Sequence, residues 1–164
     1  MSETCPHCNQ VMVLPYTGRN DMLLVGEYPD LWDKNRGIPF SGEDGEILKY
    51  EMSRYGMNIW DCNLTTLWLH DKNKNGMCFQ MGVQSLTKEM AGRKVLLMGA
   101  ELSKYFLDVS IMDVAGIEVI SPLFPTSVQF VMMSPAPGTC KHTTHGEFRL
   151  AIEKFIKRCK EVQN

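Results

Sequence analysis

The feature that most constrains the fold is a series of short apolar runs, each followed by a helical pattern. The clearest run lies within residues 93–98 and has the continuous apolar character of a strand buried on both faces. Further strands are predicted within residues 21–27, 59–69 and 127–133. Strands that alternate with helices favour a parallel sheet. We therefore predict an α/β fold of three layers, α/β/α, around a central, mainly parallel four-stranded sheet.

The helices are predicted at residues 41–55, at 78–91, from residue 99 onward, and at the end of the chain. The terminal helix carries apolar residues at helical spacing, which form its expected buried stripe. These residues are Phe148, Ala151, Ile152, Phe155 and Ile156. Between the last two strands, residues 112–123 are expected to form a short extended excursion.

Length and composition indicate how the chain is organised. Its 164 residues (1–164) suit a single domain, in which residues 1–20 form a cysteine-bearing segment. The hydrophobic share of 44% is typical of a soluble globular protein, and no apolar run is long enough to span a bilayer. The first residues lack a signal-peptide pattern, so we expect a cytoplasmic protein without a membrane partner. The net charge of −2 means that any binding of nucleic acid depends on local basic patches.

Three loops are expected to leave the carboxyl ends of the parallel strands. They are residues 27–41, the segment after residue 69, and residues 134–142. In open α/β sheets, ligands bind at this edge. The first loop is long, and long ordered loops are often functional.

Two glycine-bounded blocks follow the first predicted strand. They are Gly26-Glu27-Tyr28-Pro29 and Gly37-Ile38-Pro39-Phe40-Ser41-Gly42. Together, at this spacing, they resemble the uracil-DNA glycosylase superfamily, especially its iron–sulfur, family-4-like branch and the small phage-encoded relatives of that branch. The strand order, the chain length and a third strand ending in Leu-Met-Gly-Ala extend the resemblance over most of the chain. The resemblance implies a uracil-DNA glycosylase-like domain that flips a base out of DNA and cleaves its N-glycosidic bond.

The resemblance also implies roles for three residues of the first loop. Cleavage needs a positioned water and a nearby negative charge, and Glu27 is the expected catalytic carboxylate. Asp33 falls where the family has a second acidic group that orders water, although a solvated turn residue is an alternative interpretation. Phe40 is the expected platform on which the base stacks. The alternative for Phe40 is a loop side chain that packs on the core.

The remaining substrate-binding candidates include two departures from the family pattern. Gly26, Tyr28 and Pro29 are expected in the pocket wall. Thr66 stands where the family has an asparagine that reads uracil, and its single hydroxyl does not replace an amide's paired donor and acceptor. Asn63 is a candidate substitute on the same strand, although a strand residue three positions earlier points to the opposite face.

The family's second signature, His-Pro-Ser-Pro, corresponds to Ser134-Pro135-Ala136-Pro137, without the histidine. In the family that histidine donates to the base oxygen, and loss of such a donor typically costs about 3 kcal/mol of barrier. Ser134 is a weak replacement, with Pro135 beside it. His142 and His145 are alternative donors.

The cysteines predict a metal site. Cys5 and Cys8 form a Cys-x-x-Cys pair, His70 falls where the resembling block has a ligand cysteine, and Cys78 opens the second helix. The resemblance implies a [4Fe–4S] cluster, and the spacing alone equally permits a structural zinc site with three cysteines and one histidine. Cys62 competes with His70 as the third ligand, and Cys140 is an outside candidate. Cys159 is most simply a core residue.

Two functions follow from these observations. The first is a DNA glycosylase that hydrolyses uracil or another modified base from single- or double-stranded DNA. The second is a glycosylase-fold protein of weak or lost catalysis that binds DNA or a replication or repair protein. A phage-encoded protein would act in the host cytoplasm.

Overall fold

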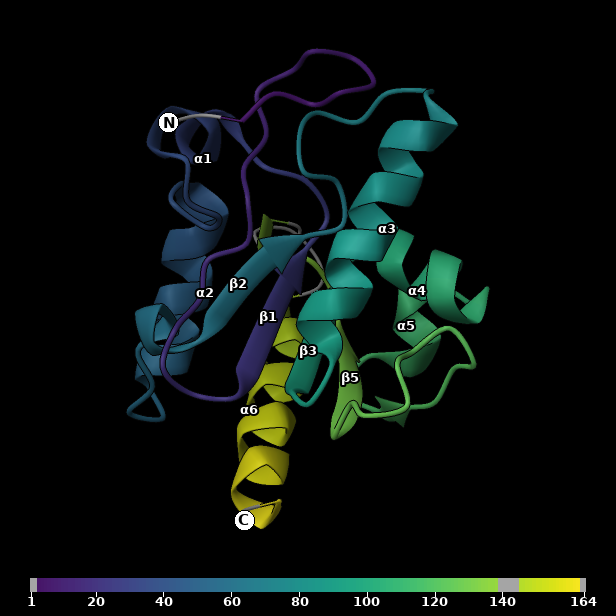
Figure 1. Ribbon diagram of the computed structural model, residues 1–164. Coiled ribbons are helices and arrows are strands. Elements are labelled where there is room, and N and C mark those ends of the chain that lie inside the picture. Colours follow the sequence, from purple (N-terminus) through teal and green to yellow (C-terminus); the bar gives the residue numbers. More distant parts are fainter. Residues whose placement is uncertain (1–2, 139–144, 163–164) are drawn as a thin grey trace.

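The computed structural model describes residues 3–138 and 145–162 and has an α/β fold (Figure 1). One five-stranded sheet forms its centre, in the order β2-β1-β3-β5-β4. The strands are β1 (Met22–Gly26), β2 (Asn63–Thr66), β3 (Lys94–Met98), β4 (Glu118–Val119) and β5 (Phe130–Ser134). Strands β2, β1, β3 and β5 are parallel, and β4 pairs with β5 in the antiparallel direction. The predicted four-stranded parallel sheet is therefore present, and the short β4 adds a fifth strand at one edge.

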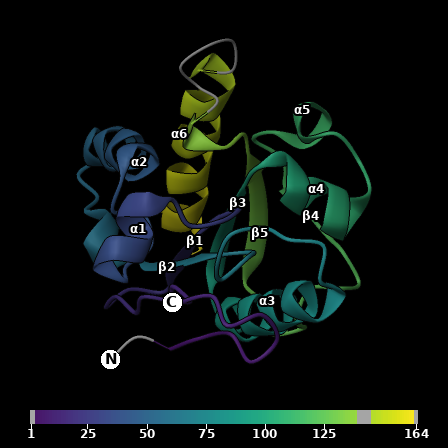
Figure 2. The ribbon, with the colours of Figure 1, turned by 90° about the horizontal axis from the view of Figure 1, so that it is seen from above.

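Helices cover both faces of the sheet (Figure 2). They are α1 (Leu31–Arg36), α2 (Glu43–Ser53), α3 (Gly76–Met90), α4 (Ala100–Leu107), α5 (Ile111–Val114) and α6 (His145–Glu161), with the 3-10 helix η1 (Ile59–Asp61). One core contains buried residues of α2, η1 and α6, and the other contains buried residues of α3 and α4. The predicted three-layer arrangement is thereby confirmed.

The two cores follow from the alternation of side chains along the strands. Leu24 and Leu96 pack in the core with α2 and α6, whereas Leu23, Val25 and Val95 pack in the core with α3 and α4. All five residues are fully buried, as expected for parallel strands that are covered on both faces. The buried stripe predicted for the terminal helix is also confirmed, because its five residues are all buried in α6.

The structure corrects one prediction about the first loop. A short helix, α1, interrupts residues 27–41. Asp30 accepts a hydrogen bond from the Asp33 backbone, and Asp33 accepts one from the Asp30 backbone, which forms a reciprocal cap. The helix ends at Gly37 in a left-handed conformation.

The carboxyl ends of β1, β2, β3 and β5 meet at one edge of the sheet. The N-terminal segment lies across this end of the molecule, near the start of α3 (Figure 1). Its backbone is held there because the Val13 N–H donates to the Leu69 carbonyl at 2.7 Å. Among the described residues, no helix combines the length and apolar character needed to cross a membrane.

Candidate functional site

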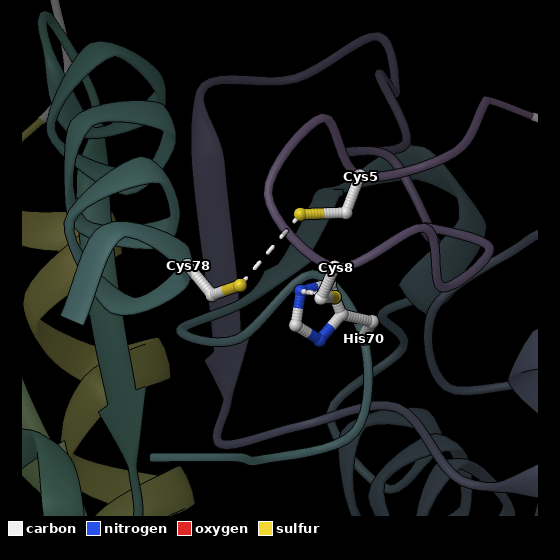
Figure 3. A group of neighbouring side chains, drawn as sticks. All are labelled: Cys5, Cys8, His70 and Cys78. Carbon is white, nitrogen blue, oxygen red and sulfur yellow. Dashed lines mark hydrogen bonds between the residues drawn. The ribbon is translucent and has the colours of Figure 1, made fainter. Parts of the chain in front are cut away.

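The N-terminal segment presents two cysteines from a tight turn. The Cys5 N–H donates to the Gln10 carbonyl at 2.8 Å, and the Asn9 N–H donates to the Cys5 carbonyl at 2.9 Å. Asn9 closes the turn with a positive φ of 66°, which asparagine adopts more readily than most residues. The Cys5 and Cys8 side chains are thereby held on the same side of the turn (Figure 3).

Two further ligands reach this turn from distant parts of the chain. His70 follows β2, and Cys78 lies in the first turn of α3, whose start is capped by the Asn75 side chain. The four side chains point toward one another (Figure 3). The Cys5 and Cys78 Sγ atoms lie 3.7 Å apart, and Cys8 Sγ lies 3.4 Å from His70 Nε2. All four ligand atoms lie within 4.8 Å of one another, so the predicted group could hold a metal ion.

The surroundings of the group orient its ligand atoms and shift the pKa values of its cysteines in both directions. The His70 Nδ1 lies 2.7 Å from the Asp71 carbonyl, and a proton on Nδ1 leaves Nε2 free to bind a metal. The His7 N–H donates to Cys5 Sγ at 3.4 Å, and the Asn73 amide donates to Cys78 Sγ at 3.6 Å. A backbone hydrogen bond from Gln10 lowers the pKa of Cys8, whereas burial raises the pKa of Cys78.

The other cysteines have different environments. Cys62 is buried, and its sulfur accepts a hydrogen bond from Asn20, so it is not part of the metal-ligand group. Cys159 is buried in the core on α6, and burial raises its pKa to about 12. Cys140 lies outside the described residues.

A second site lies at the carboxyl edge of the sheet. It is a pocket of about 390 Å³. Its lining combines residues that follow β1, residues at the start of α2, and residues of the segment after β5. The lining residues are Gly26, Glu27, Tyr28, Asp30, Asp33, Phe40, Glu43, Asp44, Thr66, Met98, Ala136, Pro137 and Gly138.

The Glu27 carboxylate lies at the start of α4. Its Oε2 accepts a hydrogen bond from the Glu101 backbone N–H at 2.8 Å. This contact requires glycine at position 99, because a Cβ there would lie 2.4 Å from the Glu27 carboxyl carbon and the backbone has φ of 142°. Burial raises the pKa of Glu27, although the N–H of Glu101 and the charge of Lys72 act in the opposite direction. The side chain is therefore a partly desolvated carboxylate beside a cavity.

Phe40 forms an apolar wall of the same pocket. The side chain is only 7% exposed, and the backbone has a positive φ of 60°, an uncommon conformation for a bulky residue. The ring passes so close to Gly26 that a Cβ at that position would lie 3.1 Å from the ring. Phe40 thus packs against the core and still lines the cavity, so its two sequence-based interpretations are compatible.

Asp33 is buried, which excludes the interpretation as a solvated turn residue. Its carboxylate accepts hydrogen bonds from the Ser41 N–H at 2.7 Å and the Asp30 N–H at 3.3 Å. Burial, together with the charge of Asp30, raises the pKa of Asp33 to about 6. Asp33 therefore joins α1 to the Phe40 turn and also lines the pocket.

Several predicted substrate-binding residues either donate hydrogen bonds within the protein or lie outside the pocket. Thr66 lines the pocket, but its hydroxyl donates to the Trp68 carbonyl at 2.6 Å. The Ser134 hydroxyl is fully buried and donates to the Pro135 carbonyl at 2.8 Å. Ser134, Pro135 and Pro29 are not among the lining residues.

Asn63 does not replace the missing family asparagine. Its amide donates to the Asn20 and Met22 carbonyls at 2.9 Å and accepts from the Gly18 N–H at 3.0 Å. The Asn63 side chain thus binds the segment that leads into β1 and lies away from the pocket. This position agrees with the alternation of side chains along a strand. His142 lies outside the described residues, and His145 is an exposed residue at the start of α6.

The sequence reasoning missed several pocket residues. Glu43 and Asp44 line the pocket from the first turn of α2, and Asp30 does so from the cap of α1. Asp30 with Asp33 three positions later was a readable capping signal. With Glu27 and Asp33, the three missed residues give the pocket five acidic side chains.

The fold and the two sites define an α/β protein with a cysteine–histidine metal-ligand group and an acidic pocket at the carboxyl edge of its sheet. No protein-family model matches the sequence, and no curated protein matches it either.

Proposed function

We propose that this protein is a DNA glycosylase that receives an everted base in the pocket beside Glu27 and Phe40. The observation that carries the proposal is that a partly desolvated carboxylate and an aromatic ring line the same cavity. Enzymes that act on a base in DNA need an aromatic or apolar face for the base and polar groups at the reacting bond. The resemblance of the two glycine-bounded blocks to the uracil-DNA glycosylase superfamily points to the same chemistry.

The proposed mechanism assigns one task to each of three residues. Phe40 stacks on the base, and its unusual positive φ fits a backbone held in place for function. Glu27, when ionised, orients the attacking water and stabilises positive charge on the sugar. Asp33 keeps the Phe40 turn in place through its hydrogen bond from Ser41 and is a second group near the water.

The polar groups of the pocket favour a base with hydrogen-bond donors. Five acidic side chains line it, and an ionised carboxylate has acceptor lone pairs beyond the backbone hydrogen bonds that Glu27, Asp30 and Asp33 already accept. The Thr66 hydroxyl is already committed to a backbone carbonyl. Uracil presents two carbonyl oxygens and one N–H, which matches these groups poorly. We therefore propose a modified base that carries amino groups or a positive charge as the preferred substrate.

A panel of oligonucleotides tests this proposal. Each carries one base, and the panel includes uracil, an amino-bearing modified base and a cationic alkylated purine, in single- and double-stranded form. Cleavage is detected as alkali-labile abasic sites. We expect the amino-bearing or cationic base to be released faster than uracil, and absence of abasic product from every substrate would contradict the catalytic proposal.

A second function, binding without cleavage, is favoured by one specific observation. The two positions where the resembling family reads and activates uracil hold hydroxyls that donate to backbone carbonyls within the protein. A protein that retains the pocket and lacks these groups could bind DNA, or a replication or repair partner, without hydrolysis. Salt-dependent binding to the panel oligonucleotides without abasic product would identify this function.

The metal centre has a structural role in this proposal. It joins the N-terminal turn, the segment after β2 and the start of α3, and its ligands are not among the pocket-lining residues. The resemblance implies a [4Fe–4S] cluster, and the donor set also suits zinc. Loss of the metal is expected to loosen the N-terminal segment before it affects the chemistry.

A further inference from the structure

We infer that Cys5, Cys8, His70 and Cys78 bind one tetrahedral ion, with zinc as the resident metal, in place of the iron–sulfur cluster that the resemblance implies. The inference concerns this centre alone and is independent of the glycosylase proposal.

The distances between the ligand atoms fit a single ion. Zinc binds sulfur at about 2.3 Å and nitrogen at about 2.0 Å, so a tetrahedral site separates two sulfurs by about 3.8 Å and sulfur from nitrogen by about 3.5 Å. The Cys5 and Cys78 sulfurs are 3.7 Å apart, and Cys8 Sγ lies 3.4 Å from His70 Nε2. All remaining pairs lie within 4.8 Å, so the four donor atoms form one compact group.

A four-iron cube requires a different arrangement. Each ligand of such a cluster binds its own iron, so the four donor atoms are spread around the cube and cannot converge on one point. Backbone contacts resist this spreading. The turn that carries Cys5 and Cys8 is closed by the bond from Cys5 to Gln10, and it is tied to the residue before His70 by the bond from Val13 to Leu69.

The chemistry of the donors agrees with zinc. Three thiolates and one neutral imidazole form a common structural zinc set, and a Cys-x-x-Cys pair is a common half of it. The N–H groups that donate to Cys5 and Cys78 offset the excess negative charge of three thiolates on a divalent ion. The Asp71 carbonyl fixes the His70 ring with Nε2 toward the other ligands.

The arrangement also assigns the type of site. Four protein ligands complete a tetrahedron and leave no open position for a substrate or water, which is the pattern of a structural zinc site. Cys5, His70 and Cys78 are at most 1% exposed, and Cys8 is the partly exposed ligand. We therefore assign the ion to holding the N-terminal segment on α3.

Metal analysis of the intact protein tests the inference. The protein is produced in cells supplied with both iron and zinc and is purified without oxygen, and then zinc, iron and acid-labile sulfide are measured per chain. We expect one zinc, no stoichiometric iron and no sulfide. Four irons with sulfide would overturn the single-ion inference, one iron without sulfide would overturn the choice of zinc, and absence of bound metal would overturn both.

Cobalt(II) replacement tests the ligand set with spectroscopy and does not rely on activity. The wild type should show the intense visible bands of tetrahedral cobalt and sulfur-to-cobalt charge transfer. His70→Cys keeps four ligands and should increase the charge-transfer intensity by about one third, from three thiolates to four. His7→Ala is the matched control, because His7 takes part in the described hydrogen bonds through its backbone, and its spectrum should be unchanged. An unchanged His70→Cys spectrum, or a changed His7→Ala spectrum, would contradict the assigned ligands.

Discussion

Replacement of Glu27 by glutamine separates its two roles, as the cap of α4 and as the proposed catalytic carboxylate. An amide oxygen can still accept the Glu101 N–H, so the variant loses the charge and keeps the hydrogen bond. A negative charge at a helix N-terminus contributes about 0.3–1 kcal/mol, and a charge-assisted hydrogen bond exceeds a neutral one by about 1 kcal/mol. Burial of the charge acts against this gain and outweighs it, because the pKa of Glu27 is raised overall.

We therefore expect Glu27→Gln to leave the free energy of unfolding at neutral pH unchanged or to raise it by up to about 1 kcal/mol, equivalent to about 2–4 °C in Tm. The rate of base release should fall at least about 100-fold, because general-base groups contribute roughly 10²–10⁴-fold. Single-turnover release of the best substrate in the panel measures the rate, and chemical denaturation measures stability.

The pH dependence of the wild type gives an independent measure. If ionised Glu27 orients the water, the rate should fall as the pH drops through its raised pKa, above the ordinary 4.5, and the variant should lose this limb. Glu43→Gln is the matched control, since it neutralises another acidic side chain of the same pocket. Rates within threefold for Glu27→Gln and the wild type would refute the catalytic role, as would an equal loss in Glu43→Gln.

Two further changes probe the same pocket. Phe40→Leu retains an apolar side chain but lacks the aromatic face and part of the ring volume, so it should cost about 1–3 kcal/mol of stability. Base–aromatic stacking contributes about 1–3 kcal/mol, so we expect the affinity for oligonucleotides to weaken by roughly 5- to 150-fold. Fluorescence anisotropy measures this affinity, and an unchanged value would contradict the stacking role. The pKa of Asp33 is raised from 3.8 to about 6, so between these pH values the folded state holds a proton that the unfolded state has lost. The stabilisation that comes from protonated Asp33 is therefore fully present below about pH 4 and is lost as the pH rises to 6. The full shift corresponds to about 3 kcal/mol, and solvent screening reduces it. Asp33→Asn should therefore reduce the decline of the unfolding free energy between pH 4 and 6 by about 1–2 kcal/mol. Glu153→Gln, on the exposed face of α6, is the control, and an unchanged decline in Asp33→Asn would contradict the raised pKa.

The strands could be predicted from the sequence because their signals are local, whereas the metal-ligand group was predicted from a Cys-x-x-Cys pair, the family resemblance at His70 and the need for four ligands. Residues 93–98 contain an apolar run too short for a helix, and parallel strands require that their carboxyl ends share an edge. His70 and Cys78 both lie in or next to the segment that follows β2, so the topology alone brings them near each other. Cys5 and Cys8 are predicted as the other two ligands because a structural metal site needs four.

The details of the pocket depend on tertiary contacts that the sequence does not display. Proline and glycine around residues 29–39 favour a loop, so the sequence did not predict α1, although Asp30 and Asp33 form its capping signal. The requirement for Gly99 appears only when Glu27 from another segment approaches its backbone. The hydrogen bond from the Thr66 hydroxyl to the Trp68 carbonyl likewise depends on the path of the chain after β2.

For the proposed activity on DNA, the charge distribution around the pocket would limit how the DNA approaches. Five acidic side chains line the cavity. Lys72, whose charge acts on Glu27, is already paired with Glu101 at 3.1 Å, and Lys34, which follows Asp33 in α1, is paired with Asp71 at 2.9 Å. A phosphate placed over the pocket mouth would meet repulsion that water and salt screen only in part. An everted base, in contrast, enters without its phosphate, and amino groups or positive charge on it are attracted by the same carboxylates that repel the backbone. If the protein acts on DNA as proposed, the acidic pocket would weaken general affinity for DNA and favour discrimination between bases, in contrast to a protein that binds DNA through its phosphates.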